Sequence, residues 1–261
     1  MATFDGNKTT RYGMAGSQAN AAAFDAGLRA YMLRVYNYMA IGVAITGVLA
    51  LLTSMAATTT DPSMAAAQLG NGEYLTNLGV MLYASPLRWV VMLAPLGFVF
   101  FLSARISKMS TSSAQLTFWA FAALMGVSLS SIFLVYTGGS ITRVFFISSA
   151  TFGALSLYGY TTKKSLSAWG SFLFMGLIGV IIASVVNLFI ASSALQFAIS
   201  VVGVLVFAGL TAYDTQKIKE MYAAVDDSEV AGKKAIMGAL RLYLDFINLF
   251  IMLLSLFGNR N

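Results

Sequence analysis

The stretch AIMGALRLYLDFINLFIMLLSLF, residues 235–257, decides the fold, because it is an apolar run long enough to cross a bilayer and carries a single carboxylate, Asp245. The preceding apolar segment, VVGVLVFAGLTAYDTQKIKE at residues 201–220, carries Asp214 near its polar end. A charged carboxylate in hydrocarbon costs several kcal/mol, so each acid is expected to face a protein interior, a water-filled cavity or a partner charge. Two such acids in neighbouring segments predict a shared site.

A polar stripe is expected along the last segment. On a helix, Arg241, Asp245 and Asn248 stand at positions i, i+4 and i+7, which places a cation, an acid and an amide on one face. The residues around them are mostly apolar. Arg241 and Asn248 are therefore candidates to line a polar pathway beside the acid.

Composition indicates an integral membrane protein. Of 261 residues, 58% are apolar and 10% are charged, against roughly 25% charged residues in an ordinary soluble domain. The chain contains no cysteine and no histidine, so it has no disulfide, no thiol nucleophile and no histidine-based zinc site or acid/base chemistry. No cofactor is expected.

Apolar runs of about membrane-spanning length recur along the chain, and no alternating β-barrel pattern accompanies them. We place seven of them at 34–55, 87–106, 114–136, 141–161, 167–190, 195–214 and 236–257. The sequence thus predicts an all-α integral membrane protein, a bundle of seven transmembrane helices. Residues 1–30 are polar and rich in glycine and alanine, which predicts a flexible cytoplasmic tail, and residues 31–261 form a single membrane domain.

The positions of the basic residues predict the orientation. With a cytoplasmic N-terminus, every Lys and Arg except Arg88, Arg143 and Arg260 falls on the cytoplasmic side. The net charge of +6 then reflects the excess of basic residues on the cytoplasmic side, so we expect no nucleic-acid partner. Seven spans put the C-terminus outside, unless the last segment, with Arg241 and Asp245 near its start, is a shallow or re-entrant element.

Four strings resemble the Bax inhibitor-1 family, also called the transmembrane BAX inhibitor motif family, in its bacterial branch. They are SPLRWVVMLAPLGFVFFLSARI, WGSFLFMGLIGVIIASVVNLF, LTAYDTQKIKEMY and ALRLYLDFINLFIMLL. The similarity covers about residues 30–257. It implies a multi-pass protein of the bacterial inner membrane, in which the last, acid-bearing helix is central and the other six surround it.

The resemblance also implies a function. In that family an aspartate pair on the last two helices is described as a proton-sensitive site in a calcium leak pathway, and the pair matches Asp214 and Asp245. An arginine near the cytoplasmic end of the second helix is proposed to latch onto the first aspartate in the closed state, and Arg105 stands at the matching position. Some bacterial relatives carry a glutamate within the second helix, where this chain has an apolar run around Ala94 and Pro95.

The chemistry of the acid pair fits gating by protons. Two carboxylates held close in a poorly hydrated site cannot both ionise cheaply, so they share a proton and titrate as a pair. Calcium prefers roughly six to eight oxygen ligands. Asp214 and Asp245, with the Asn248 amide, backbone carbonyls and water, would hold it weakly and transiently, which suits permeation.

A structural role is the alternative for each of these residues. The two aspartates could be a hydrogen-bonded anchor that fixes helix register with Arg105 or Arg241. Arg105 could simply extend its side chain so that its charge lies at the membrane–water interface, because a basic residue is expected at a cytoplasmic helix end. Asn187, in VVNLF, could line the pathway or make an interhelical hydrogen bond.

Three function classes remain open. The first is a pH-sensitive calcium leak, with the bilayer and calcium ions as partners. The second is a regulatory interaction protein, a suppressor of stress or cell death or a modulator of a membrane protein partner such as a membrane protease. The third, an intramembrane aspartyl protease, fits worst, because Thr211, Ala212 and Tyr213 precede Asp214 in place of a GxGD motif. We therefore do not expect an enzyme.

Overall fold

A computed structural model describes residues 7–69 and 74–261, with side chains described from residue 22 onward. Within these residues, seven helices are long and apolar enough to cross a membrane. They are α1 (Asn7–Ala57), α3 (Leu87–Arg105), α4 (Thr111–Leu129), α6 (Gly138–Thr161), α7 (Ser167–Ile190), α8 (Ser193–Glu220) and α9 (Ser228–Phe257). The prediction of an all-α membrane bundle with seven spans is confirmed.

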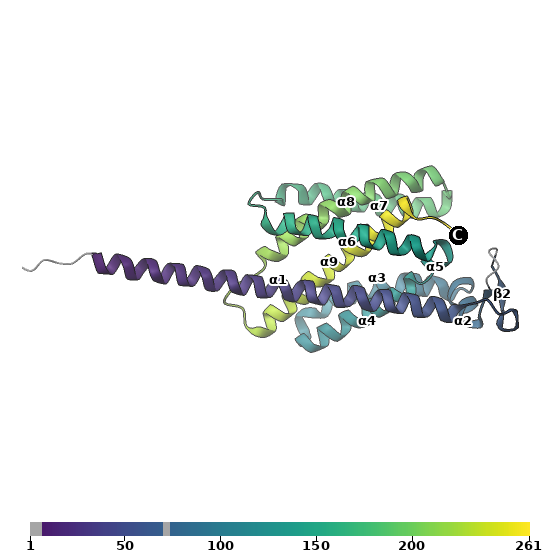
Figure 1. The fold of residues 1–261 in the computed structure, drawn as a ribbon, viewed down its shortest axis with the longest axis horizontal. Coiled ribbons are helices and arrows are strands. Elements are labelled where there is room, and N and C mark those ends of the chain that lie inside the picture. Colours follow the sequence, from purple (N-terminus) through teal and green to yellow (C-terminus); the bar gives the residue numbers. More distant parts are fainter. Residues whose placement is uncertain (1–6, 70–73) are drawn as a thin grey trace, which may run out of the picture.

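Two of the helices differ from the expected segments. Helix α1 begins at Asn7, well before the apolar run at 34–55, and extends beyond the bundle (Figure 1). The alanine-rich run before the first span favours helix and accounts for the difference. The expected flexible cytoplasmic tail over residues 1–30 stays a prediction. The last helix is 30 residues long and qualifies as a full span, so the shallow or re-entrant alternative does not describe it. Residues 1–6 of the expected tail lie outside the described part.

Polar side chains fix where four of the helices begin. Ser110, Thr137, Ser192 and Asp227 precede α4, α6, α8 and α9, and each accepts a hydrogen bond from a backbone N–H in the first turn. Such caps satisfy N–H groups that the helix itself leaves without partners. The sequence therefore sets the helix starts locally, even where the apolar run begins later.

The connection between α1 and α3 is more ordered than the expected loop. It contains the strands β1 (Thr58–Thr59), β2 (Ala67–Gln68) and β3 (Tyr74–Leu75), paired antiparallel in the order β1-β3-β2. Short helical turns add η1 (Pro62–Met64), α2 (Asn77–Gly79) and η2 (Val80–Ala84). Asp61 caps η1, and the backbone N–H and the hydroxyl of Ser63 lower the pKa of this carboxyl group. The remaining short elements are η3 (Ile106–Lys108) and α5 (Ile132–Val135).

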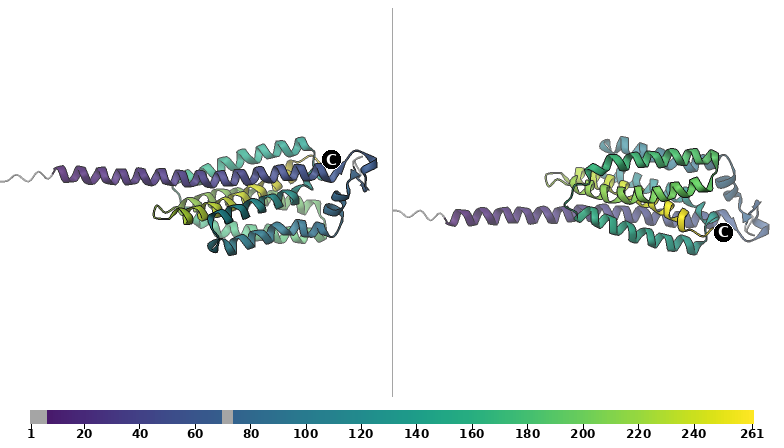
Figure 2. Two further views of the ribbon diagram at one scale, coloured as in Figure 1. Left: turned by 90° about the horizontal axis from the view of Figure 1, so that it is seen from below. Right: turned by 90° about the horizontal axis from the view of Figure 1, so that it is seen from above.

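The helices form two groups with α9 running obliquely between them (Figure 1). One group contains α6, α7 and α8, and the other contains α1, α3 and α4. Of the seven spans, α9 has the largest buried share, and it packs against α1, α4, α6 and α8. In contrast, α3 packs mainly on α4 and α7 mainly on α8, and the views in Figure 2 show α1 along one side of the bundle.

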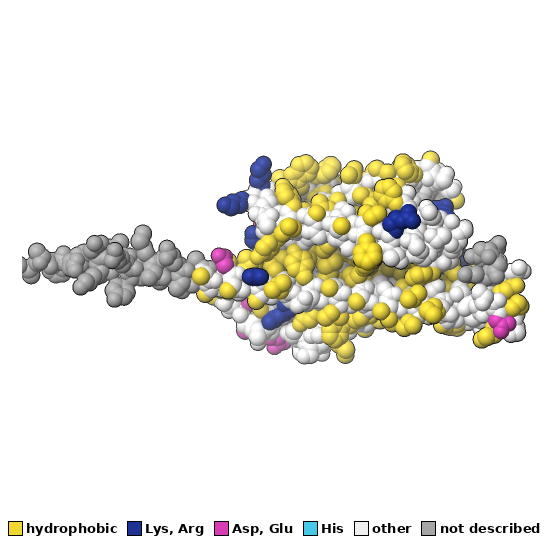
Figure 3. Space-filling model, in the orientation of Figure 1, with side chains coloured by type: hydrophobic (Ala, Val, Ile, Leu, Met, Phe, Trp, Pro, Cys, Tyr) yellow, Lys and Arg dark blue, Asp and Glu magenta, His cyan; other side chains and the backbone are white. Residues whose placement is uncertain are grey.

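Glycines allow the closest helix contacts. A Cβ added at Gly126 of α4 would stand 2.6 Å from the Thr46 carbonyl oxygen of α1, and one at Gly159 of α6 would collide with the Ala212 carbonyl group of α8. Small residues of this kind let backbones approach one another in lipid. Apolar side chains cover the outside of the bundle, and cationic side chains gather at the end where α1 enters (Figure 3).

Candidate functional site

The two aspartates line a cavity of about 1100 Å³ that is partly open to the surface of the bundle, where the lining residues Leu96, Phe174 and Leu188 are more than half exposed. Its walls come from α3, α7, α8 and α9, with Met125 from α4. Most of the lining is apolar, including Pro95 and Leu96 on α3 and Phe174 on α7. Helices α3 and α7 lie at the periphery of the bundle. The cavity therefore leaves open space beside the faces of α8 and α9 that carry the two acids.

Asp245 is the buried member of the pair. Only 5% of the residue is exposed, and among the described atoms its Oδ2 has no hydrogen-bond partner. Asp214 on α8 lines the same cavity. Burying a carboxyl oxygen without a hydrogen-bond partner costs free energy, so stability alone does not explain the position of Asp245.

The stripe on α9 borders the same cavity. Arg241, Asp245 and Asn248 all line it, as their helical spacing led us to expect. A guanidinium nitrogen of Arg241 lies 3.9 Å from Oδ1 of Asp214, which is longer than a charge-assisted hydrogen bond. The Asn248 side chain donates to the Leu244 carbonyl oxygen at 2.8 Å. The structure thus brings together one cation, two acids and one amide.

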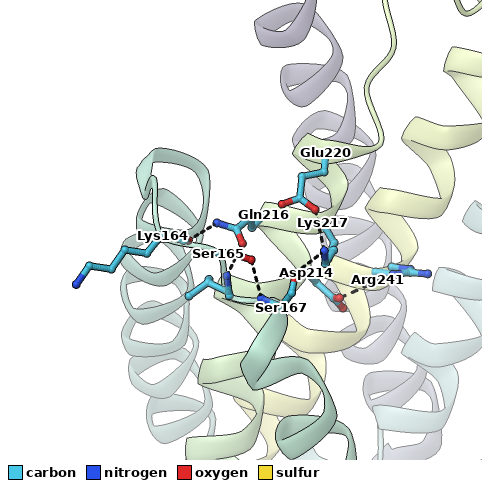
Figure 4. Close-up of polar contacts among 9 residues, drawn as sticks. Lys164, Ser165, Ser167, Asp214, Gln216, Lys217, Glu220 and Arg241 are labelled. Atoms are coloured by element: carbon cyan, nitrogen blue, oxygen red, sulfur yellow. Dashed lines mark hydrogen bonds and ion pairs between the residues drawn. The ribbon is translucent and has the colours of Figure 1, made fainter.

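A polar cluster lies at the end of α8 just beyond Asp214 (Figure 4). Gln216 accepts from the Leu166 backbone N–H at 2.7 Å and donates to the Lys164 carbonyl oxygen at 2.9 Å, which ties the α6–α7 connection to α8. Lys217 donates to Ser167 and Glu220, each at 2.8 Å. These two residues stand two and three positions after Asp214 in the string YDTQK, but the sequence did not indicate which elements they contact.

Arg105 is not among the residues that line the cavity. It ends α3, is exposed, and its guanidinium carbon lies 6.0 Å from the centre of the Phe101 ring. The ion-pair partner of Asp214 in this structure is Arg241. A latch between Arg105 and Asp214 would belong to another state of the protein and stays a prediction.

Asn187 does not line this cavity. It lies near the end of α7, where its side chain donates to Gln196 at 3.2 Å and accepts from the Ser192 backbone N–H at 3.0 Å. These bonds support the tight turn between α7 and α8, in which Ala191 has a left-handed backbone with φ of 53°. The hydrogen-bonding alternative describes Asn187 in this structure.

The acid pair offers too few ligands for a resident metal. Among the described residues, no group of three or more acidic, histidine or cysteine side chains could hold an ion. Calcium normally takes about six to eight oxygen ligands, so two carboxyl groups and an amide would leave most positions to water or backbone carbonyls.

The chain was compared with known proteins. A profile of the family described as inhibitor of apoptosis-promoting Bax1 matches residues 28–261. The inner membrane protein YbhL of Escherichia coli is 44% identical over 237 residues, which cover 90% of this chain and 94% of that protein. An uncharacterised protein of Rickettsia prowazekii is 48% identical over 237 residues, covering 91% and 92% of the two chains. One from Caulobacter vibrioides is 43% identical, covering 90% of each.

Proposed function

The chain belongs to the Bax inhibitor-1 family, and on that premise we propose that it is a proton-sensitive cation leak of the bacterial inner membrane, with calcium as its ion. The observation that carries this proposal is the position of the pair: Asp214 and Asp245 face one cavity of a membrane-spanning bundle, and among the described residues one of their oxygens is buried without a partner. Acids within membrane spans commonly mark ion or proton pathways.

Proton sensitivity follows from the pair's surroundings. When both acids are ionised, Arg241 is the single cation that lines the cavity with them. Binding one proton removes the repulsion between the carboxyl groups and weakens the hold of Arg241 on Asp214. A difference of about 1.4 kcal/mol between two states already changes their ratio tenfold, so one proton can shift a gate.

The other helices add few titratable groups. Among the residues that line the cavity, α3, α4 and α7 contribute no acid, base or tyrosine, and α8 adds Tyr213. Lys217, one turn further along α8, is engaged with Glu220 and Ser167. The Tyr243 hydroxyl bonds with Thr46. The two aspartates are therefore the groups through which we expect pH to act.

Localisation and orientation are part of the proposal. The E. coli relative is named an inner membrane protein, and we propose the same membrane for this chain. The excess of Lys and Arg at the end where α1 enters the bundle favours a cytoplasmic N-terminus. Calcium would then pass between the outer side and the cytoplasmic mouth next to Asp214.

Reconstitution tests this function. Wild type and Asp245→Asn would be placed in liposomes loaded with a calcium dye, and Asp61→Asn, in the connection between α1 and α3, would serve as the matched acid control because asparagine also caps helices. We expect influx above that of protein-free liposomes, altered severalfold by Asp245→Asn and unchanged by Asp61→Asn. Influx equal to protein-free liposomes, with folded wild type confirmed by size-exclusion chromatography, would contradict the leak and leave the interaction role.

A further inference from the structure

A second cavity lies on the side of the bundle formed by α1 and α6. Its volume is about 670 Å³, within the range of about 300–1,000 Å³ that ligand pockets occupy. Helix α1 packs mainly on α4 and α9, and α6 mainly on α8 and α9, which leaves a groove between α1 and α6. Both helices are membrane spans, so the groove faces the bilayer.

The groove is apolar along its length. Leu33 of α1 and Leu157 of α6 flank it with 52% and 62% of their surfaces exposed, and Phe152 packs at its base. A Cβ added at Gly153 would meet no atom within 4 Å, so the groove is open there. An extended hydrocarbon chain matches this shape and lining.

Two of the hydroxyl groups on the groove's wall, those of Tyr36 and Ser156, already have partners. The Tyr36 hydroxyl bonds with Ser156 at 2.7 Å, and Ser156 bonds with Thr215 of α8 at 2.9 Å. A ligand therefore does not need to supply hydrogen bonds deep in the groove. This favours an apolar chain over a polar solute.

Two cations stand at one end of the groove. Arg29 lines it and is exposed, and Lys219 donates to the Tyr160 carbonyl oxygen at 2.8 Å with its amine 5.3 Å from the centre of the Tyr160 ring. Neither cation forms an ion pair with a residue of the described part of the chain. A phosphate group would find two positive partners next to the apolar groove.

We propose that this groove binds one anionic phospholipid, with an acyl chain along Leu33, Gly153 and Leu157 and the phosphate beside Arg29 and Lys219. Basic pockets between transmembrane helices bind anionic headgroups in this way. The site is separate from the cavity of the acid pair and does not depend on ion permeation.

Native mass spectrometry of the purified full chain tests the proposal. The protein would be titrated with phosphatidylglycerol and with phosphatidylethanolamine of the same acyl chains. We expect one phosphatidylglycerol to bind more tightly than phosphatidylethanolamine. Arg29→Gln should weaken phosphatidylglycerol binding by about fivefold, the effect of one basic residue at an anionic headgroup, and Arg34→Gln on the same helix should not.

A second pair of variants tests the acyl groove. Gly153→Leu should abolish tight binding of both lipids by filling the groove, whereas Gly179→Leu, at an open position on α7, should bind as wild type does. Leucine favours helix over glycine, so both variants should fold. Equal affinity for the two lipids, or unchanged binding to Gly153→Leu, would overturn the proposal.

Discussion

Arg241 and Arg105 are two candidate partners for Asp214, and the structure contains the pair with Arg241. Because a nearby cation stabilises a carboxylate, Arg241→Gln should let the acid pair take up its proton at higher pH. We therefore predict that the pH of half-maximal calcium flux rises in Arg241→Gln and stays near the wild-type value in Arg105→Gln. Flux measured against pH in liposomes checks this, and the reverse order would favour the Arg105 latch.

The hydrogen bond between Tyr243 and Thr46 is expected to stabilise the folded protein. The Tyr243 hydroxyl lies 2.6 Å from Oγ1 of Thr46, which itself donates to the Ala122 carbonyl oxygen at 2.8 Å. Tyr243→Phe keeps the second bond and should cost about 1 kcal/mol, whereas Thr46→Val leaves the buried Tyr243 hydroxyl without a partner and should cost about 1–3 kcal/mol. Thermal unfolding in detergent would measure both, and an equal or smaller loss in Thr46→Val would contradict the assignment.

Residues on one helix were easier to predict than contacts between helices. The spacing of Arg241, Asp245 and Asn248 fixed their common face, because helix geometry is local. The roles of Gln216 and Lys217 depend on the α6–α7 connection, about 50 residues earlier in the chain, and no local pattern indicates that contact.

At the scale of elements, two glycines on α6 make a matched test of packing. Gly159 touches the backbone of α8, while Gly153 faces open space. Gly159→Ala should force α6 and α8 apart and destabilise the protein by about 1–3 kcal/mol. Gly153→Ala should be neutral or stabilise by up to about 1 kcal/mol through helix propensity. Thermal unfolding of both variants gives the answer, and equal stability would show that α6 and α8 are not in close contact.

The spans were predictable because apolar length is a direct requirement of the bilayer. The ends of the spans and the connections between them were not predictable from apolar length. Helix α1 starts well before its apolar run, and α9 starts at Ser228 because Asp227 caps it. The strands β1 and β2 both pair with β3, and pairings between such short segments leave no pattern in the sequence.

The orientation of the whole molecule in the membrane can be tested by labelling single cysteines. The chain has no cysteine, so single cysteines can be introduced without background. With a cytoplasmic N-terminus, Ser63→Cys in the α1–α3 connection should react with a membrane-impermeant maleimide in intact spheroplasts. Ser228→Cys, at the start of α9, should react only after lysis. The opposite pattern would show that the bundle is inverted.

In our proposal the Asp214 and Asp245 pair senses protons and controls ion flux. The most direct measurement is calcium influx into liposomes between about pH 6 and pH 8 for wild type, Asp214→Asn and Asp245→Asn, since carboxylates that share a proton titrate together. We expect a flux that depends on pH in wild type and loses that dependence in both variants. An identical pH dependence in all three proteins would contradict it.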